Sequence, residues 1–327
     1  MFGVVFSMII TIKNSKKKIE TTQEVGFAFV PDQIRKKSIE NGFYINILVV
    51  GRRGLGSSTL INNLFCSPIV DKEREDDITF VKNEIFENDI KLTANISTYH
   101  LNNLERIKNY IENKLKEYYD MEQSLIKAKV DNKIHVCLYM IPGDKITKEE
   151  IELMKEISQM CNFLPIISKT DSYTEEELRY KKQQVLEIFD ENDIRTYSPP
   201  NTSEVFNFPL AVIASGQIHN INGNLHRGRM YPWGFIDVEA HDTSDLIALR
   251  KILIHSYLDD LINKTNQNFY ESYRLKRLER ESIDENLKAE RIKKIKEEIQ
   301  NIMSEQNDIK NSENLYKRIG QVSIDER

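Results

Sequence analysis

The chain has 327 residues, of which 30% are charged, and its formal net charge is only −5. This length allows one large domain, or a domain of roughly 200–250 residues with an extension, and the balanced charge leaves no global footprint for nucleic acid, so no nucleic-acid partner is expected. The three cysteines, Cys66, Cys137 and Cys161, are far apart, which favours reduced core thiols in a cytoplasmic protein over disulfides or a zinc site.

Residues 1–25 are expected to form a disordered N-terminal extension. Met1–Ile12 is apolar, but this run is too short to span a bilayer. Basic residues follow the run instead of preceding it, and no small-residue cleavage site is visible, so it does not resemble a signal peptide. The alternative is upstream sequence ahead of a true start near Met8.

Residues 26–42 form a basic lead-in that begins with an extended stretch. It contains the compact cluster Arg35, Lys36 and Lys37. Such a cluster is commonly a solvated surface, but it can also meet anionic lipid headgroups, with about 1 kcal/mol from each basic residue. Both interpretations stay open.

A glycine-rich loop, Gly51–Thr59, lies between a predicted strand and a predicted helix. Its sequence GRRGLGSST has the glycine spacing of the phosphate-binding loop G-x-x-x-x-G-K-[ST]. The apolar run Tyr44–Val50 predicts a buried parallel strand before it, and the helical spacing of apolar residues in Ser58–Phe65 predicts a helix after it. The lysine position of the motif holds Ser57, so the loop lacks its usual charge.

The following elements alternate between strands and helices. Thr79–Ile96 has the pattern of a hairpin, and Leu101–Lys129 that of an amphipathic helix. Further predicted strands are Ile134–Ile141, Phe163–Ser168 and Phe208–Ser215, and further predicted helices are Lys148–Met160, Thr174–Asp190 and Ser244–Thr265. The alternation predicts an α/β fold with a mostly parallel sheet flanked by helices. Ligands of such folds bind where the strands end at their carboxyl side.

Two features lie outside this alternation. Asn222-Gly223-Asn224 lies between two extended stretches and predicts a hairpin, and the run RGRMYPWG that follows contains Trp233, the only tryptophan of the chain. Residues 271–327 are predicted to be a charged helical tail, either a solvated single helix or a short coiled coil. Its weak heptad seam consists of Ile292, Ile295, Ile299, Ile302 and Ile309.

With these motifs in order, the chain resembles a divergent septin from about Gly26 to Arg274. Septins are filament-forming guanine-nucleotide-binding proteins. The resemblance implies that residues 43–270 are a septin-type G domain with the fold of P-loop GTPases, a septin-type hairpin insertion and a C-terminal helix. Asn222–Glu239 and Leu249–Arg274 carry the most specific likeness, because phosphate loops alone are common.

The resemblance also implies which residues bind the nucleotide. Septins read the base with Ala-Lys-Ala-Asp, which is Ser168-Lys169-Thr170-Asp171 here. A carboxylate suits guanine, which offers two neighbouring N–H donors, although Asp171 could instead cap the helix that begins near Thr174. Arg229 matches a septin arginine that contacts the nucleotide, and Ala214 replaces a glycine that faces the base. The expected nucleotide-binding residues are Gly51, Gly54, Gly56, Ser57, Ser58, Thr59, Lys169, Asp171, Glu177, Ala214 and Arg229.

The phosphate and switch motifs depart from the septin pattern. Loss of the lysine at Ser57 removes a charge-assisted hydrogen bond of about 1.5–3 kcal/mol, for which Arg52 or Arg53 could partly substitute. Ser58 could still reach Mg²⁺. Septins carry Asp-Thr-Pro-Gly where this chain has Thr98–Leu101, so the carboxylate that orients Mg²⁺ and the glycine that senses the γ-phosphate are both missing.

The expected function is therefore a structural septin subunit of the cytoskeleton, in cytokinesis or cortical organisation, that binds GTP or GDP weakly, permanently or not at all. Its expected partners are other septins, with Tyr231 and Trp233 in the subunit interface, and anionic membrane lipids. Its expected location is cytoplasmic, at the cell cortex or division site. The alternatives are an active GTPase with a non-standard phosphate loop and a small monomeric GTP-dependent switch. For Tyr231 and Trp233 the alternative is a role as core aromatics of the hairpin.

Overall fold

The computed structural model describes residues 9–10, 19–20, 29–70, 78–88, 90–101, 104–124, 131–200, 206–221, 223–240, 242–283 and 293. The chain divides into two compact units, Met1–Gln267 and Asn268–Arg327. In the second unit residues 271–283 are helical. The isoleucines of the predicted coiled-coil seam lie outside the described residues, so that prediction stays a prediction.

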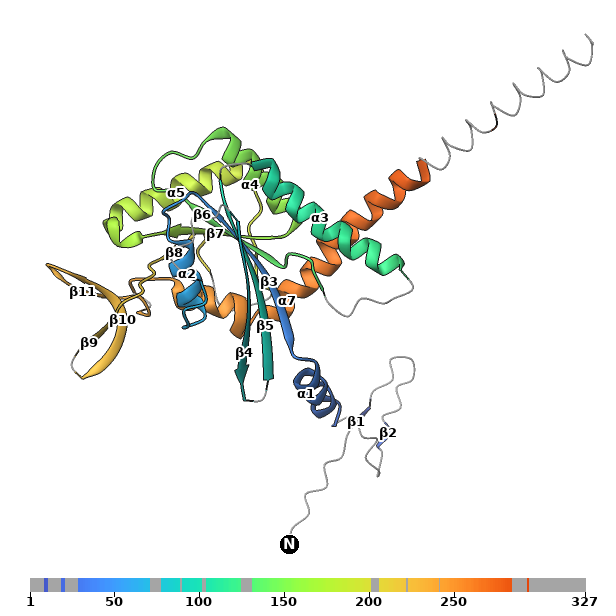
Figure 1. The fold of residues 1–327 in the computed structure, drawn as a ribbon, viewed down its shortest axis with the longest axis horizontal. Helices are drawn as coiled ribbons and strands as arrows, with labels where there is room; N and C mark the ends of the chain where they lie inside the picture. Colours follow the sequence, from blue (N-terminus) through green and yellow to red (C-terminus); the bar gives the residue numbers. More distant parts are fainter. Residues whose placement is uncertain are drawn as a thin grey trace, which may run out of the picture. The chain divides into compact units, whose positions relative to one another are not determined.

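A six-stranded sheet forms the centre of the first unit (Figure 1). Its strands, in spatial order, are β4 (Ile78–Glu87), β5 (Ile90–His100), β3 (Phe43–Gly51), β6 (Val136–Ile141), β7 (Asn162–Ser168) and β8 (Leu210–Val212). Only β4 runs antiparallel to its neighbour; the other pairs are parallel. The central strands are continuous apolar runs because helices cover both faces of the sheet, which confirms the predicted mostly parallel α/β fold.

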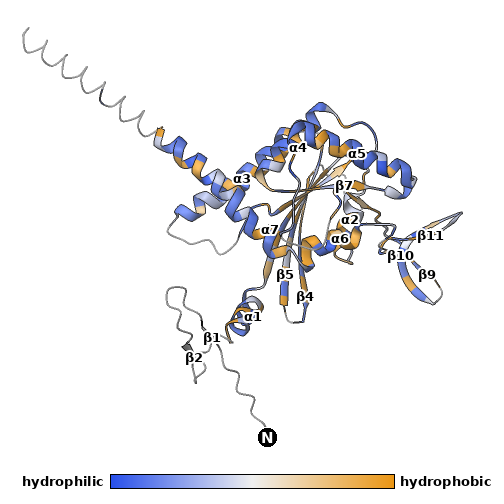
Figure 2. Cartoon of the chain, turned by 180° about the vertical axis from the view of Figure 1, so that it is seen from behind, coloured by the Kyte–Doolittle hydropathy of each residue, from blue (hydrophilic) through white to orange (hydrophobic). Residues whose placement is uncertain are grey.

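Two sets of helices cover the two faces. One core packs α3 (Leu104–Gln123), α4 (Lys148–Met160) and α5 (Glu175–Asn192) against the sheet. The other contains residues of α2 (Ser57–Leu64), α6 (Leu246–Arg250), η3 (Lys251–His255) and α7 (Leu258–Lys264), which leads into η4 (Thr265–Tyr270). Figure 2 shows the outward faces of α3, α4 and α5 as largely hydrophilic, as the 3.6-residue pattern predicts.

Most predicted elements differ from the structure by a few residues at their ends, and two differ more. Ser244–Thr265 is not one helix, because η3 is a π-helical turn and Ser256 and Tyr257 interrupt it. Leu253 before the break and Leu261 after it are both buried, as is Tyr257 within it. The predicted strand Phe208–Ser215 shortens to β8. Amides at and just after β8 bind side chains instead of another strand: Ala211 N–H donates to Asp245, and Ile213 N–H donates to Ser244.

The basic lead-in contains a helix that the sequence reading did not predict. This helix, α1, spans Val30–Asn41, with Pro31 and Asp32 in its first turn and Gly42 at its end. Proline at the first helical position and an acidic first turn both favour a helix start, and Gly42 has a positive φ of 69°. Before it, the described residues of the extension are β1 (Ile9–Ile10) and β2 (Ile19–Glu20), which pair antiparallel.

A small second sheet carries the segment that contains Trp233. It has the order β11 (Gly234–Asp237), β10 (Asn224–Tyr231) and β9 (Ile218–Ile221), all antiparallel (Figure 1). The predicted hairpin is β9–β10, and β11 is a third strand that the sequence did not reveal. Gly228 allows β11 to approach, because a Cβ atom there would lie 2.3 Å from the carbonyl oxygen of Ile236.

Candidate functional site

A cavity of about 250 Å³ opens where β3, β6, β7 and β8 end at their carboxyl side. Its apolar floor consists of Leu60, Met140, Ile166 and Val212. Two further groups of residues complete it. We call Gly54, Leu55, Gly56 and Thr59, where the sequence predicts phosphate, the phosphate side, and Ser168, Lys169, Ala214 and Arg229, where it predicts the base, the base side. The cavity therefore forms where α/β sheets bind their ligands.

The loop of the phosphate side has the backbone that its glycines predict. Gly54 and Gly56 have φ angles of 83° and 93°, and a Cβ atom at either position would meet nothing within 4 Å. Glycine is thus favoured at both positions because of the positive φ angle, and not because a larger side chain would lack room. Helix α2 begins at Ser57, directly after Gly56, and the free amides of a helix start favour an anion. Of the predicted Ser57, Ser58 and Thr59, only Thr59 lines the cavity.

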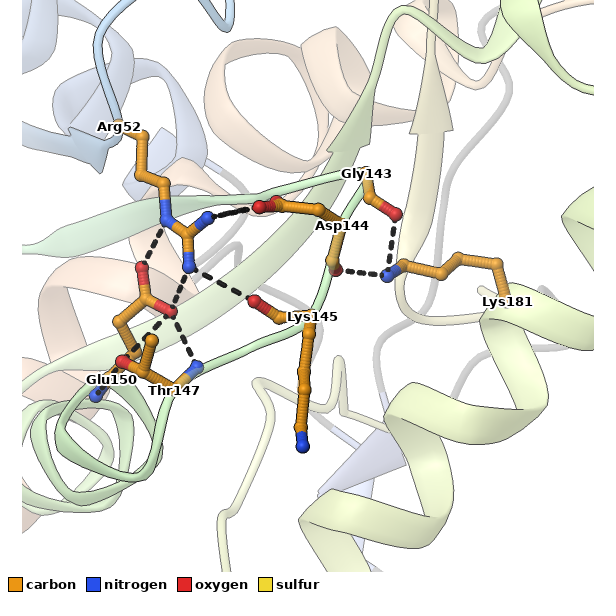
Figure 3. A network of polar contacts seen from close by, with 7 residues as sticks. All are labelled: Arg52, Gly143, Asp144, Lys145, Thr147, Glu150 and Lys181. Carbon is orange, nitrogen blue, oxygen red and sulfur yellow. Dashed lines mark hydrogen bonds and ion pairs between the residues drawn. The ribbon is translucent and has the colours of Figure 1, made fainter.

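Arg52 does not supply the missing positive charge to the cavity. Its guanidinium is absent from the cavity lining and pairs with Glu150 and Asp144 in the connection that follows β6 (Figure 3). Arg52 therefore does not stand in for the lysine.

The switch position, by which we mean Thr98–Leu101, lies at the end of strand β5. Strand β5 continues through His100, which pairs in register with Gly51, and Leu101 N–H donates to the Gly51 carbonyl at 3.2 Å. Thr98 and Tyr99 are buried, and the Tyr99 ring packs 4.9 Å from that of Tyr110. Burial raises the pKa of Tyr99 to about 12, so the phenol stays neutral. A flexible, phosphate-sensing loop at this position would need an unpaired backbone.

On the base side, Asp171 lies at the centre of a hydrogen-bonded cluster. Its side chain is 2% exposed, and Oδ2 accepts a bond of 2.6 Å from Arg229 Nη1 and another from the Tyr231 hydroxyl. Arg229 also donates to the Ala214 carbonyl from Nε and Nη2, at 3.2 and 2.8 Å. Burial opposes the charge of Arg229, but its bonds to Tyr231 and Asp171 outweigh burial and raise its pKa. The cluster joins the segment that follows β7, the segment that follows β8, and strand β10, which are far apart in sequence.

Among the described residues, three buried polar atoms of this side have no hydrogen-bond partner: Ser168 Oγ, Thr170 Oγ1 and Asp171 Oδ1. Buried polar atoms are normally satisfied, so a polar ligand is the natural partner for them. Asp171 itself does not line the cavity, but its hydrogen-bond partner Arg229 and its neighbour Lys169 do. A carboxylate oxygen without a partner at this depth suits a ligand with N–H donors, such as the N1–H and N2–H edge of guanine. The residues present therefore fit a guanine base.

The alternative in which Asp171 caps a helix is wrong. Asp171 lies in the short 3₁₀ helix η2 (Thr170–Ser172), and α5 is capped by Thr174. Glu177 completes the capping box: its carboxylate accepts from the N–H and hydroxyl of Thr174 at 2.8 and 3.0 Å. These bonds lower the pKa of Glu177. Glu177, predicted to bind nucleotide, does not line the cavity.

The two aromatics predicted at an interface stack on each other. The rings of Tyr231 and Trp233 are 4.5 Å apart and nearly parallel, at 6°. Trp233 is 74% exposed, so it is not a core residue of the hairpin. Exposed Ile218, Leu225 and Met230 lie on the same small sheet. The Tyr231–Asp171 bond spans 60 residues, and no local sequence signal pointed to it.

The remaining predicted sites can be placed but not assigned a ligand. Arg35, Lys36 and Lys37 are exposed on α1. Across the described ranges, no helix is both long and apolar enough to cross a membrane. The same residues contain no group of three or more His, Cys, Asp or Glu side chains placed for a metal ion, and Ser58 stays the predicted contact for Mg²⁺.

Comparison with known proteins adds an independent finding. The septin family model matches residues 41–288. "Cell division control protein 10" of Encephalitozoon cuniculi is 46% identical over 283 residues, covering 83% of this chain and 80% of that protein. Septin-2A of Xenopus laevis is 32% identical, covering 80% and 83%. The crystal structure of a septin GTPase domain from Chlamydomonas reinhardtii superposes with a TM-score of 0.58 at 22% identity, covering 71% of this chain and 99% of that one, which shows the shared fold.

Proposed function

The chain belongs to the septin family, and on that premise we propose that it is a structural filament subunit that holds a guanine nucleotide without hydrolysing it. The observation that carries the proposal is the contrast within one cavity. The base side keeps a buried carboxylate oxygen free for a ligand, whereas β5 runs as a paired strand through the switch position.

The base side supports guanine as the ligand. Among the described residues, Asp171 Oδ1 is buried without a partner, and Arg229, which binds Asp171, lines the cavity together with Lys169 and Ala214. The stem of Lys169 can lie along the face of a base. Gly54 and Gly56 shape amides that receive phosphate, with Gly51, Ser57, Ser58 and Thr59 in the same loop, and GTP or GDP, with or without Mg²⁺ on Ser58, is the proposed occupant.

The phosphate side supports the loss of hydrolysis. Serine at position 57 cannot bridge the β- and γ-phosphates as lysine does, and Thr98–Leu101 offers neither the Mg²⁺-orienting carboxylate nor the sensing glycine. The alternative is an active GTPase that uses Arg52 or Arg53 in place of the lysine. Arg52 is disfavoured for this role because its guanidinium pairs with Glu150 and Asp144, and Arg53 does not line the cavity. These are the coordinated changes that make the phosphate and switch motifs degenerate.

Assembly with other septins is the proposed role. Two of the similar proteins carry the name cell division control protein, which supports cytokinesis or cortical organisation as the setting, in the cytoplasm at the cortex or division site. Trp233, exposed and stacked on Tyr231, has the aromatic character that dominates binding energy at interfaces. The exposed Arg35, Lys36 and Lys37 on α1 are the proposed contact for anionic lipids.

One measurement tests the nucleotide part directly. The purified full chain is denatured and the released nucleotide is identified and counted, and steady GTP turnover is measured beside it. About one GDP or GTP per chain without turnover is the expected result. Sustained turnover that disappears in Asp171→Ala would establish the GTPase alternative instead. Failure to co-assemble with any sister septin at low salt would contradict the filament role.

A further inference from the structure

The arginine that follows the first glycine of the phosphate loop is held by two carboxylates. Arg52 Nε and Nη2 donate to Glu150 Oε1 and Oε2, each at 2.7 Å. Arg52 Nη1 donates to both oxygens of Asp144, at 2.8 and 2.7 Å. Nη2 also reaches the Lys145 carbonyl at 3.0 Å. Figure 3 shows the guanidinium enclosed by these three residues. A forked pair of this kind fixes orientation as well as charge.

The two carboxylates differ in burial. The side chain of Glu150 is 5% exposed, that of Arg52 is 29% exposed, and that of Asp144 is 71% exposed. Glu150 is also the third residue of α4, where its Oε2 accepts from Thr147 N–H at 2.9 Å in a capping box. The Arg52–Glu150 pair is therefore the more rigid of the two, and the Arg52–Asp144 pair is exposed to water and correspondingly weaker.

Electrostatics keep the buried arm charged. Burial favours the neutral acid, but hydrogen bonds from Arg52 and Thr147 outweigh it and lower the pKa of Glu150. The hydrogen bond with Glu150 raises the pKa of the Arg52 guanidinium. The pair thus persists at neutral pH, and removal of either member leaves the other without its partner.

The contact joins two segments that leave the sheet side by side. Gly51 pairs with Met140 in the parallel ladder of β3 and β6, so the phosphate loop and the connection to α4 begin at the same edge. Lys181 of α5 donates to the Gly143 and Asp144 carbonyls, at 3.1 and 2.9 Å. This connection is therefore braced from its other side and gives Arg52 a firm anchor (Figure 3).

We propose that Arg52 is a positioning residue that fixes the phosphate loop. Through its buried pair with Glu150 and its bond to the Lys145 carbonyl, it holds the start of the loop so that the amides of Leu55–Thr59 keep the geometry that receives phosphate. It acts on the ligand through the loop and does not touch it. Only the identity of the ligand, a guanine nucleotide, rests on the proposed function. Preset amides bind an anion more tightly because ordering them costs no free energy at the moment of binding.

The test compares a ligand that has phosphates with one that has none. Guanosine and GDP are titrated into the full chain as wild type, Arg52→Ala, Glu150→Gln and the double variant. GDP affinity is expected to fall about tenfold in each single variant, while guanosine affinity stays unchanged because the base side is intact. The double variant should bind GDP no more weakly than the weaker single variant, since both remove the same contact.

Asp144→Asn is the matched control. It alters the exposed arm of the same guanidinium, and GDP affinity should change by less than about threefold. Equal losses of guanosine and GDP in Arg52→Ala would mean a general structural role and would overturn the proposal. Effects that multiply in the double variant would overturn it as well, because Arg52 and Glu150 would then act independently.

A second measurement keeps the inference separate from the proposed function. If the wild type binds neither ligand, the proposed function fails, and hydrogen exchange of the Leu55–Thr59 amides decides the role of Arg52. Exchange about tenfold faster in Arg52→Ala and Glu150→Gln supports it, and unchanged exchange overturns it. If either variant does not fold, Arg52→Lys replaces it, because lysine keeps the charge but cannot form the forked pair. The same loss of GDP affinity or of amide protection is then expected. Wild-type behaviour of Arg52→Lys overturns the proposal.

Discussion

The two sides of the cavity each hold an arginine–carboxylate pair, and the two pairs are built for different purposes. Arg229 lines the cavity and leaves Asp171 Oδ1 without a partner. Arg52 turns away from the cavity, and both oxygens of Glu150 accept hydrogen bonds from protein groups. A half-satisfied buried carboxylate can still bind a ligand, whereas a fully satisfied one stabilises the fold. In the roles proposed above, the Asp171 pair recognises the ligand and the Arg52 pair supports the loop.

Removal of the base-side carboxylate should cause the largest loss of GDP affinity. Asp171→Ala removes the acceptor for two guanine N–H donors, each bond to a charged group contributing about 1.5–3 kcal/mol. GDP affinity should fall by roughly a hundredfold or more, as measured by calorimetry. Asp171→Asn, which has nearly the same shape, separates loss of charge from loss of packing. Wild-type affinity in both variants would remove Asp171 from the site.

The phosphate side should respond in the opposite direction when its missing charge is restored. Ser57→Lys adds one charge-assisted bond to phosphate and should raise GDP affinity by roughly ten- to a hundredfold. Steady GTP turnover should stay absent, because Thr98–Leu101 is unchanged. Turnover restored by this substitution alone would show that the strand at the switch position does not prevent hydrolysis.

The aromatic stack beyond the base side should matter for assembly and not for folding. Trp233→Ala should weaken co-assembly with sister septins by about 2 kcal/mol or more, the range of an interfacial anchor, as measured by sedimentation. The midpoint of thermal unfolding should change little, because Trp233 is 74% exposed. Leu225→Ala is the control, because Leu225 is another exposed apolar residue of the same small sheet, in the β9–β10 pair and away from the turn that holds Trp233. Assembly that survives Trp233→Ala would place the interface elsewhere.

Acid should weaken the loop support with a predictable sign. The folded-state pKa of Glu150 is lowered from 4.5, so its contribution to the free energy of unfolding is present above pH 4.5 and is lost as pH falls through the folded pKa. Glu150→Gln should cost about 1 kcal/mol at neutral pH, and the difference from wild type should shrink below pH 4.5. Chemical denaturation across this range measures it. A difference that does not depend on pH would mean that the Glu150 charge adds nothing.

Local patterns predicted the elements that frame the cavity. Helix α4 spans Lys148–Met160 as predicted, because Thr147 and Glu150 provide a capping box and the apolar residues follow the helical period. Strand β3 and the loop glycines likewise have the predicted conformation. By contrast, α1, β11 and the break after η3 were not predicted. Helix α1 buries no residue and carries its own start and stop signals in Pro31, Asp32 and Gly42, so those local signals were overlooked. Strand β11 depends on its pairing with β10, which no local signal reveals.

The sequence by itself determined the family and the order of most strands and helices, and it predicted the residues that could read guanine. These depend on short-range spacing, which every segment carries within itself. Only the tertiary structure decided that Arg52 binds Glu150, that Tyr231 donates to Asp171, and that Trp233 is exposed. Those contacts join residues up to 98 positions apart, and the neighbour of a side chain is set by which strands and loops the fold brings side by side.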